Sequence, residues 1–573
     1  MHRTVLQQHP TFAEQYVPKL VTVLREGYRA CDLKADAIAG LTVAIVALPL
    51  SMAIAIASGV GPERGLYTAI VGGFLVSALG GSRFQVGGPA GAFIVLVAGC
   101  VHAIGVGGLM TATFLAGLML VAVGLFRLGT YIKYIPYPVT VGFTAGIAVI
   151  IFASQVKDLL GLSMAGAEPP AFLAKIAAIW AARETVSAAA VGLAALTVAV
   201  ILGLKRVRPH WPGLLIAVGM ASVVAAVAGL PVETIGSRFG ELPRMLPAAA
   251  LPDLTREGVL RALPFAVSFA LLGAIESLLS AVVADGMTGR RHRSNAELVA
   301  QGVANLGSAV FGGIVVTGTI ARTATNVRAG SRGPVSGMLH AVFVLLFMFV
   351  AAPLATYIPL TALAGVLAVV AWNMVEKEEF WVLLRSSAGD ALVLLTTFLL
   401  VVFRDLTEGI VVGFLLGALL FIRRMSEAAQ VEERAALVPE DEADEMRPYD
   451  PAAAIDSEVV VYRIKGAFFF GAASTVGAVL ERIADRPKGF VVDFAEVPFL
   501  DSSGAHAVEL LARKLARKGG VLVLTGTSPE MRRTLGLLGL RPPRAIYAET
   551  IAQGTAAAHA ALSPTAQSTT ATA

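Results

Sequence analysis

Fourteen apolar segments between residues 35 and 422 constrain the fold of this chain more than any other feature. The longer ones match the roughly 20 residues that a helix needs to cross a bilayer. Lipid offers no partners to open backbone groups, so such a chain must span the membrane as helices. The segments predict an all-α polytopic membrane protein with 14 spans. They are residues 35–57, 66–80, 88–103, 107–126, 136–156, 184–204, 213–230, 262–284, 296–311, 319–330, 334–352, 359–375, 388–403 and 406–422.

Composition supports this class and argues against others. The 573 residues are 56% hydrophobic and 15% charged, unlike those of an ordinary soluble protein. The net charge of +5 belongs to loops and predicts no nucleic-acid partner. Cys31 and Cys100 are too few for a disulfide framework or a metal cluster, and no triad, Walker A motif or metal-ligand spacing suggests an enzyme or a cofactor. Residues 1–34 lack the apolar run of a signal peptide and are expected to be a cytoplasmic segment.

Loop charge predicts the orientation of the spans. With the N-terminus in the cytoplasm, the cytoplasmic loops and their flanks hold fifteen Lys and Arg residues. The outside loops hold nine, seven of them in the long loops 157–183 and 231–261. This distribution fits the positive-inside rule, and a register error of one span would invert it.

Two conspicuously short segments, the third and the tenth, occupy the third place in each set of seven. Gly87, Gly88 and Pro89 interrupt the chain before the first, and the stretch 311–330 contains the second. Matching interruptions of this kind indicate inverted repeats with a binding site near the bilayer midplane. The small hydroxyl residues Thr317 to Thr319 are expected to open the second half-helix, with Arg322 one turn in. The positive ends of both half-helices, together with Arg322, would then form a binding site for an anion. The alternative is that this stretch is a cytoplasmic re-entrant loop in which Arg322 only reaches the surface.

The last part of the chain has a different character. The transmembrane domain 35–424 is followed by an acidic linker at 425–456. Residues 457–550 predict a small α/β domain. An Ala/Thr/Ser-rich tail at 551–573 is expected to be disordered. The predicted strands are Glu458–Ile464, Gly489–Phe494 and Val521–Thr525, and the predicted helices are 474–484, 503–518 and 528–537.

Taken in order, several motifs resemble those of the SulP anion transporters, which have fourteen spans in two inverted repeats and a cytoplasmic STAS domain. The resemblance covers about residues 35–550. A bacterial branch associated with C4-dicarboxylate uptake is the most similar, through Ala274–Ser280, Ala284–Gly289 and Ala371–Met374. The motifs shared with the whole family are Pro49–Ala55, Gly65–Tyr67, Gly87–Gly91, Asn326–Gly330 and Asp501–Gly504.

The resemblance implies a core domain of spans 1–4 and 8–11 that carries the substrate against a gate domain of spans 5–7 and 12–14. It also implies a small anionic substrate that is transported with protons, a homodimer, and a cytoplasmic partner at the STAS domain. The implied substrate-binding residues begin the third and tenth segments: Gly88, Pro89, Ala90, Gly91, Gly318, Thr319, Ile320, Ala321 and Arg322. Sodium-coupled members carry an Asp and a hydroxyl where this chain has Glu276 and Ile320, which argues against sodium coupling.

Glu276 is a lone carboxylate in an apolar span, with Ser280 one turn on. Intramembrane carboxylates are functional by default, so both residues are predicted to take part in proton coupling; a buried structural Glu is the alternative. In the STAS domain, one of Ser502 and Ser503 is expected to cap a helix, and phosphorylation there is the other possibility.

Together these observations predict a proton-coupled transporter of C4-dicarboxylates such as succinate or fumarate, located in the inner membrane among its lipids. Sulfate or bicarbonate transport, and an exchanger or channel-like mode, remain open alternatives. A sensor that uses its membrane part only as an anchor is disfavoured by the two paired interruptions.

Overall fold

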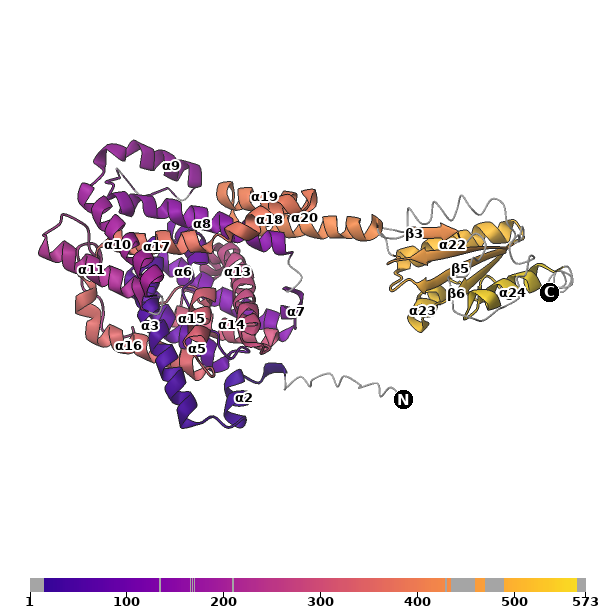
Figure 1. The fold of residues 1–573 in the computed structure, drawn as a ribbon, viewed down its shortest axis with the longest axis horizontal. Coiled ribbons are helices and arrows are strands. Elements are labelled where there is room, and N and C mark those ends of the chain that lie inside the picture. Colours follow the sequence, from indigo (N-terminus) through magenta and orange to yellow (C-terminus); the bar gives the residue numbers. More distant parts are fainter. Residues whose placement is uncertain are drawn as a thin grey trace. The chain divides into compact units, whose positions relative to one another are not determined.

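The computed structural model describes residues 15–132, 136–164, 166, 168–169, 171–208, 211–427, 430–433, 459–468 and 489–563. Two compact units divide the chain, Met1–Leu415 and Leu416–Ala573, and each is described by itself. The first unit is almost entirely helical (Figure 1). Its elements are α2 (Lys19–Arg25), α3 (Ala30–Ala57), α4 (Pro62–Tyr67), the π-helical η1 (Thr68–Gly72), α5 (Gly73–Leu79), β1 (Gly87–Gly88), the 3-10 turn η2 (Gly91–Phe93), α6 (Ile94–Leu125), α7 (Gly129–Ile132), α8 (Tyr137–Leu160), α9 (Phe172–Ala181), η3 (Arg183–Thr185), α10 (Ala188–Val207), α11 (Gly213–Val227), α12 (Ile235–Phe239), α13 (Arg256–Thr288), α14 (Ser294–Val310), β2 (Thr317–Gly318), α15 (Ile320–Arg328), α16 (Val335–Ala355), α17 (Leu360–Met374), α18 (Lys377–Ser386), α19 (Ala388–Phe403) and α20 (Leu406–Glu427).

Helix lies on each of the fourteen predicted apolar segments. Among the described residues, eight helices are long and apolar enough to cross a membrane, and α9, α11 and α19 are shorter apolar helices. The boundary predicted between the third and fourth segments is a break inside α6 at Gly105, whose φ of 71° and ψ of −179° are not helical. A residue with a side chain would be strained in that conformation, so a glycine stands at the break.

Helix packing separates the first unit into two groups. One group contains α3, α5, α6 and α13 to α16, which contact one another. The other contains α8, α10, α11, α17 and α19. These groups correspond to the predicted core and gate spans, and they meet where α17 and α11 pack against α3 and where α8 packs against α6 and η2.

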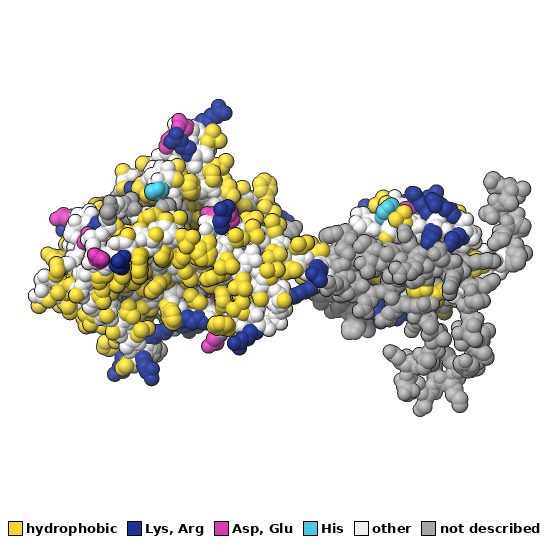
Figure 2. Space-filling view, turned by 90° about the horizontal axis from the view of Figure 1, so that it is seen from above, with side chains coloured by type: hydrophobic (Ala, Val, Ile, Leu, Met, Phe, Trp, Pro, Cys, Tyr) yellow, Lys and Arg dark blue, Asp and Glu magenta, His cyan; other side chains and the backbone are white. Residues whose placement is uncertain are grey.

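The surface of the helical unit suits a lipid environment. Figure 2 shows a broad hydrophobic face on this unit, with the charged side chains gathered mainly toward its edges. Many large apolar side chains in the helices are exposed, among them Phe349 and Phe421 at 58% and 64%. Lipid tails cover such side chains at no cost in hydrophobic free energy, so the exposure fits a membrane protein.

The second unit contains a five-stranded sheet in the order β3–β4–β5–β6–β7. The β3–β4 pair is antiparallel and the other pairs are parallel. Apolar side chains fill both faces: Phe490 and Val492 pack in the cluster that includes α22, whereas Val491 packs with Ala558 of α24. Burial on both faces explains the nearly continuous apolar run of β5. The elements are β3 (Gln430–Glu433), β4 (Val459–Lys465), β5 (Gly489–Glu496), α22 (Ser502–Arg517), β6 (Val521–Thr525), α23 (Pro529–Leu537), β7 (Ile546–Tyr547) and α24 (Ile551–Leu562).

Two expectations, for the C-terminal tail and for the linker, differ from the structure. The tail predicted to be disordered at 551–573 begins with helix α24, because Gly554 and Ala558 are small enough to pack on the sheet. The linker predicted at 425–456 contains the end of α20 and the strand β3, which finds backbone partners on β4. In the N-terminal segment 1–34, α2 and the first turn of α3 are already helical. Residues 564–573, residues 434–458 and the predicted helix 474–484 lie outside the described residues.

Candidate anion-binding site at two interrupted helices

The two interruptions predicted from the sequence meet as a short antiparallel ladder. Gly87 pairs with Gly318, and Gly88 pairs with Thr317. The Thr319 N–H extends the ladder by donating to the Val86 carbonyl oxygen at 3.2 Å. Non-helical backbone is tolerated at membrane depth only where protein satisfies its polar groups, and this ladder does so. It also fixes the starts of η2 and α15 next to each other.

Helix α15 begins one residue later than the predicted opening at Thr317–Thr319. Thr319 is its N-cap residue, but its side chain makes no capping hydrogen bond. The Thr319 hydroxyl instead donates to the Val86 carbonyl oxygen at 3.3 Å. The first backbone N–H groups of a helix have no acceptor within the helix. Without a side-chain cap, those of α15 stay available to an external acceptor, and the helix dipole favours a negative one.

Arg322 extends from the first turn of α15 into this junction and is 1% exposed. Its guanidinium donates to the Ser51 hydroxyl at 3.0 Å and to the carbonyl oxygens of Pro89 and Gly87 at 3.3 and 3.4 Å. Its Nε has no hydrogen-bond partner. All three acceptors are neutral, and no carboxylate of the described residues lies within ion-pair distance. A buried cation without a counter-ion is costly unless a ligand supplies the negative charge.

Glycine is required at Gly88 and Gly318 by close packing. A Cβ atom on Gly88 would lie 1.7 Å from Nη1 of Arg322, and one on Gly318 would lie 1.5 Å from Nε2 of Gln85. Both glycines therefore make room for neighbouring polar side chains. Gly91 is different, because a Cβ there would meet Ile151 and Met374 at ordinary contact distances of 3.4 and 3.7 Å.

The predicted substrate-binding residues differ in accessibility. Six of them are buried: Gly88, Pro89, Ala90, Gly318, Thr319 and Arg322. Gly91 and Ile320 are half-buried, and Ala321 is exposed. The accessible rim of the junction is thus made by the first residues of η2 and α15, with Arg322 behind it.

The two residues predicted for proton coupling lie on α13 but have different surroundings. Glu276 is 9% exposed and has no hydrogen-bond or ion-pair partner among the described residues. Ser280 donates to the Thr323 hydroxyl at 3.1 Å, and that hydroxyl also accepts the Val86 N–H at 3.2 Å. Ser280 therefore ties α13 to the junction, and coupling through either residue stays a prediction.

Three contacts at the junction involve residues that the sequence analysis did not single out. Ser51 contacts Arg322, Thr323 links two elements, and Asn305 holds the Val316 N–H and carbonyl at 3.0 and 2.8 Å. Ser51 falls within the quoted Pro49–Ala55 motif, so its position was marked although its role was not. A serine or asparagine in a membrane helix gives no sign of its partner 11 or more residues away.

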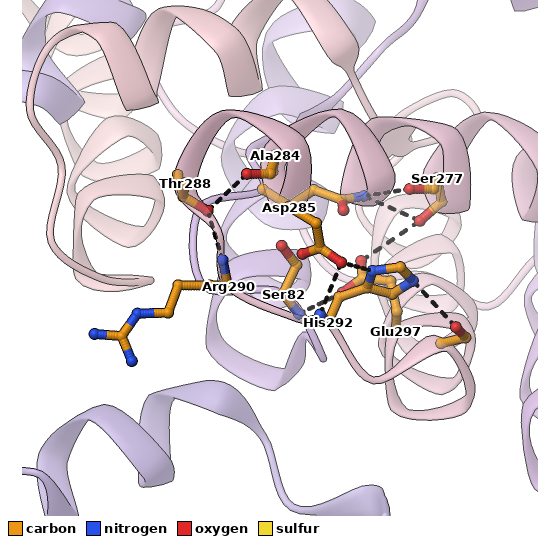
Figure 3. A network of polar contacts seen from close by, with 10 residues as sticks. Ser82, Ser277, Ala284, Asp285, Thr288, Arg290, His292 and Glu297 are labelled. Carbon is orange, nitrogen blue, oxygen red and sulfur yellow. Dashed lines mark hydrogen bonds and ion pairs between the residues drawn. The ribbon is translucent and has the colours of Figure 1, made fainter.

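Glu297 of α14 is fully buried in the structure. It accepts hydrogen bonds from the Ser82 N–H at 3.0 Å and, over a longer 3.5 Å, from the Ser277 hydroxyl (Figure 3). The side-chain amide of Gln301 donates to it at 2.9 Å. Gln85 donates to the same Ser277 hydroxyl at 3.0 Å. These carboxylate and amide groups connect α13, α14 and the chain before β1, so they position the junction.

The STAS serines are not helix caps. Asp501 is the N-cap residue of α22, and its carboxylate accepts the Gly504 N–H at 2.8 Å. Ser502 and Ser503 lie in the first turn instead, Ser502 exposed and Ser503 half-buried. An aspartate is as good an N-cap as serine, which removes the need for a serine cap. Phosphorylation of either serine stays a prediction.

Known proteins define the class to which this fold and junction belong. The model of the sulfate permease family matches residues 33–397, and the STAS domain model matches residues 450–549. The chain belongs to the sulfate permease family, also called SulP, with a C-terminal STAS domain. Its members are transporters, in agreement with the prediction that the chain is not an enzyme.

Individual relatives agree with this assignment. "Putative sulfate transporter YvdB" of Bacillus subtilis is 41% identical over 518 residues, which are 90% of this chain and 95% of that protein. "Bicarbonate transporter BicA" of a Synechocystis species is 29% identical, over 88% of this chain and 90% of that protein. The structure of murine Slc26a9, titled an anion transporter in the inward-facing state, has a TM-score of 0.82 at 18% identity and covers 98% of this chain and 96% of that one. The relatives' names do not support the predicted C4-dicarboxylate branch.

Proposed function

We propose that this protein carries a small inorganic oxyanion, sulfate or bicarbonate, across the membrane and binds it at the junction of η2 and α15. The observation that carries the proposal is the buried Arg322, whose partners among the described residues are all neutral. Sulfate and bicarbonate are the cargoes in the names of the similar proteins. The alternative from the sequence motifs, a C4-dicarboxylate, rests on motifs alone and enters the test as a competitor.

The binding step uses two kinds of donor. An oxyanion at the rim beside Gly91, Ile320 and Ala321 accepts hydrogen bonds from the open N–H groups of the half-helix, while the Arg322 guanidinium supplies the charge. Bound anion then replaces the missing counter-ion of Arg322. A dry site of this kind strengthens the attraction between the two charges relative to water.

The packing of the two helix groups suggests how the bound anion crosses the membrane. Gly91 faces Ile151 of α8 and Met374 of α17, so the rim lies against the group that corresponds to the gate. We infer that the core group slides along this small, apolar contact and carries the anion from one side to the other. A homodimer in the inner membrane, with the STAS domain in the cytoplasm as a docking site for a partner, belongs to the same proposal.

Uptake into proteoliposomes tests the cargo. Purified full-length protein is offered labelled sulfate, bicarbonate, succinate and fumarate in parallel, with and without a pH gradient. Uptake of sulfate or bicarbonate well above empty liposomes, competed poorly by succinate, is expected. Uptake of succinate alone would restore the dicarboxylate assignment, and uptake of none of the four would overturn the proposal.

Proton coupling through Glu276 is a separate proposal. An ionised carboxylate near the site would oppose an incoming anion, so anion binding favours the protonated form and each ligand strengthens the binding of the other. Glu276→Gln keeps the neutral form permanently. The variant should bind the anion with an affinity that no longer depends on pH, and it should lose accumulation driven by a pH gradient while exchange survives. Accumulation that persists in the variant would exclude Glu276 as the coupling residue.

A further inference from the structure

A basic cavity lies at the C-terminal end of α13. It has a volume of about 420 Å³, which falls in the range of small-ligand pockets, roughly 300–1,000 Å³. It is lined by Val282, Asp285, Gly289, Arg290, Arg291 and His292. None of these residues takes part in the proposed transport step, so a ligand in this cavity would be distinct from the transported anion.

Two free guanidinium groups characterise this cavity. Arg290 and Arg291 are exposed, and within the described part of the chain neither guanidinium has a hydrogen-bond or ion-pair partner. Figure 3 shows the Arg290 side chain extending away from the neighbouring polar network, to which only its backbone N–H is connected. The cavity therefore offers two positive groups to a ligand.

The one carboxylate in the lining is already engaged. A single oxygen of Asp285, Oδ2, accepts the His292 N–H at 3.1 Å and lies 2.6 Å from Nδ1 of the His292 ring. The other ring nitrogen of His292 lies 3.1 Å from the Ser294 hydroxyl. This chain of contacts holds Asp285 toward His292 and leaves the arginines unpaired. The partial negative charge at the C-terminal end of α13 repels an anion, but it is smaller than the two positive charges of the arginines.

Exposed apolar side chains occur on α13 at the basic cavity and on the neighbouring elements of the chain. Val282 lines it and is 48% exposed, and Met287 on the same helix is 40% exposed. Helix α7 packs against α13, and just before α7 the side chains of Leu125, at the end of α6, and Phe126 are 47% and 76% exposed. Exposed apolar and aromatic side chains next to arginines are typical of the boundary between acyl chains and headgroups.

We propose that this cavity binds the phosphate of an anionic phospholipid headgroup, with Arg290 and Arg291 on the phosphate and the acyl chains along Val282 and Met287. The loop charges predict that this end of α13 faces the cytoplasm. There the two arginines can contact anionic lipids of the cytoplasmic leaflet. A soluble phosphate would use the arginines but not the apolar rim, so the rim favours the lipid.

Lipid retention in native mass spectrometry tests the proposal. The full-length protein is titrated with phosphatidylglycerol or phosphatidylcholine. The double variant Arg290→Gln/Arg291→Gln is compared with Arg328→Gln/Arg332→Gln, which removes the same charge from two other exposed arginines on the predicted cytoplasmic side. Each arginine near an anionic headgroup strengthens association about five-fold, so the first variant should hold phosphatidylglycerol roughly thirty-fold more weakly and the second about as well as the parent.

Two results would overturn the proposal. Equal retention of phosphatidylglycerol by both double variants would show that the lipid is held by general surface charge. A thermal shift produced by millimolar inorganic phosphate, as large as that produced by the lipid and lost in Arg290→Gln/Arg291→Gln, would identify a site for soluble phosphate. No shift with phosphate and selective loss of lipid in the first variant is the expected outcome.

Discussion

Replacing Arg322 by methionine separates binding from folding at the proposed site. The guanidinium is 1% exposed, and its three hydrogen bonds go to neutral oxygens at 3.0–3.4 Å. Methionine fills a similar length without charge. Hydrogen bonds that involve a charged group contribute about 1.5–3 kcal/mol each, so losing one or two bonds to the anion costs about 3 kcal/mol. That corresponds to an affinity roughly 100-fold lower.

Without bound anion, the Arg322→Met variant should be as stable as the parent or more stable, although it binds the anion more weakly. The three hydrogen bonds that the guanidinium donates to neutral acceptors are long, so each contributes no more than the low end of the range for a charged group, about 1.5 kcal/mol. Removing a buried charge that has no carboxylate partner relieves a desolvation cost of several kcal/mol. We therefore expect the melting temperature of Arg322→Met without ligand to equal or exceed that of the parent.

Calorimetric titration of sulfate and bicarbonate, combined with thermal melts, measures both quantities. Arg328→Met is the matched control, since Arg328 lies on the same helix but is exposed. The reasoning fails if the two variants bind the anion equally well. It also fails if Arg322→Met melts far below the parent without ligand, because Arg322 would then be a structural tether.

Three further predictions concern other parts of the chain. Gly88→Ala should lower stability by about 1–3 kcal/mol in thermal melts because its Cβ would collide with Arg322, whereas Gly107→Ala, with no atom within 4 Å, should be neutral. Asp501→Ala should destabilise the STAS unit by about 1 kcal/mol through loss of the α22 cap, as judged by denaturant titration. Deleting residues 440–573 should leave the ranking of transported anions unchanged; an altered ranking in proteoliposomes would contradict this.

Local pattern was enough to predict the helices on the fourteen apolar segments and the three strands β4, β5 and β6, since each apolar run carries its own signal. The strand predicted at Val521–Thr525 matches β6 at both ends. The break at Gly105 also fell where the apolar runs were interrupted. Helix α24 was missed because its composition resembles that of a disordered tail and its stability comes from packing on the sheet. Tertiary contacts of that kind leave little trace in a single sequence.

The site was predicted in part for a similar reason. Paired interruptions and Arg322 could be found because glycine, proline and an intramembrane charge are visible in the sequence. The β1–β2 ladder joins residues 87–88 to 317–318, and two-residue strands have no periodicity to detect. The acceptors of Arg322 likewise come from α3 and from the chain before η2, so only the fold brings them together.

The separation of Arg322 from every described carboxylate determines how the proposed site would work. If Glu276 formed an ion pair with Arg322, an anion would have to displace a carboxylate already in contact with the guanidinium, and part of its binding energy would be lost. No described carboxylate lies within 4.0 Å of Arg322, and Glu276 has no polar partner of its own among the described residues. No described carboxylate therefore neutralises the positive charge of Arg322 before the anion binds. Any influence of Glu276 on the site must act through the electrostatic interaction of its charge with Arg322 and the anion. Protonation of Glu276 would therefore change the affinity for the anion without changing the hydrogen bonds of Arg322.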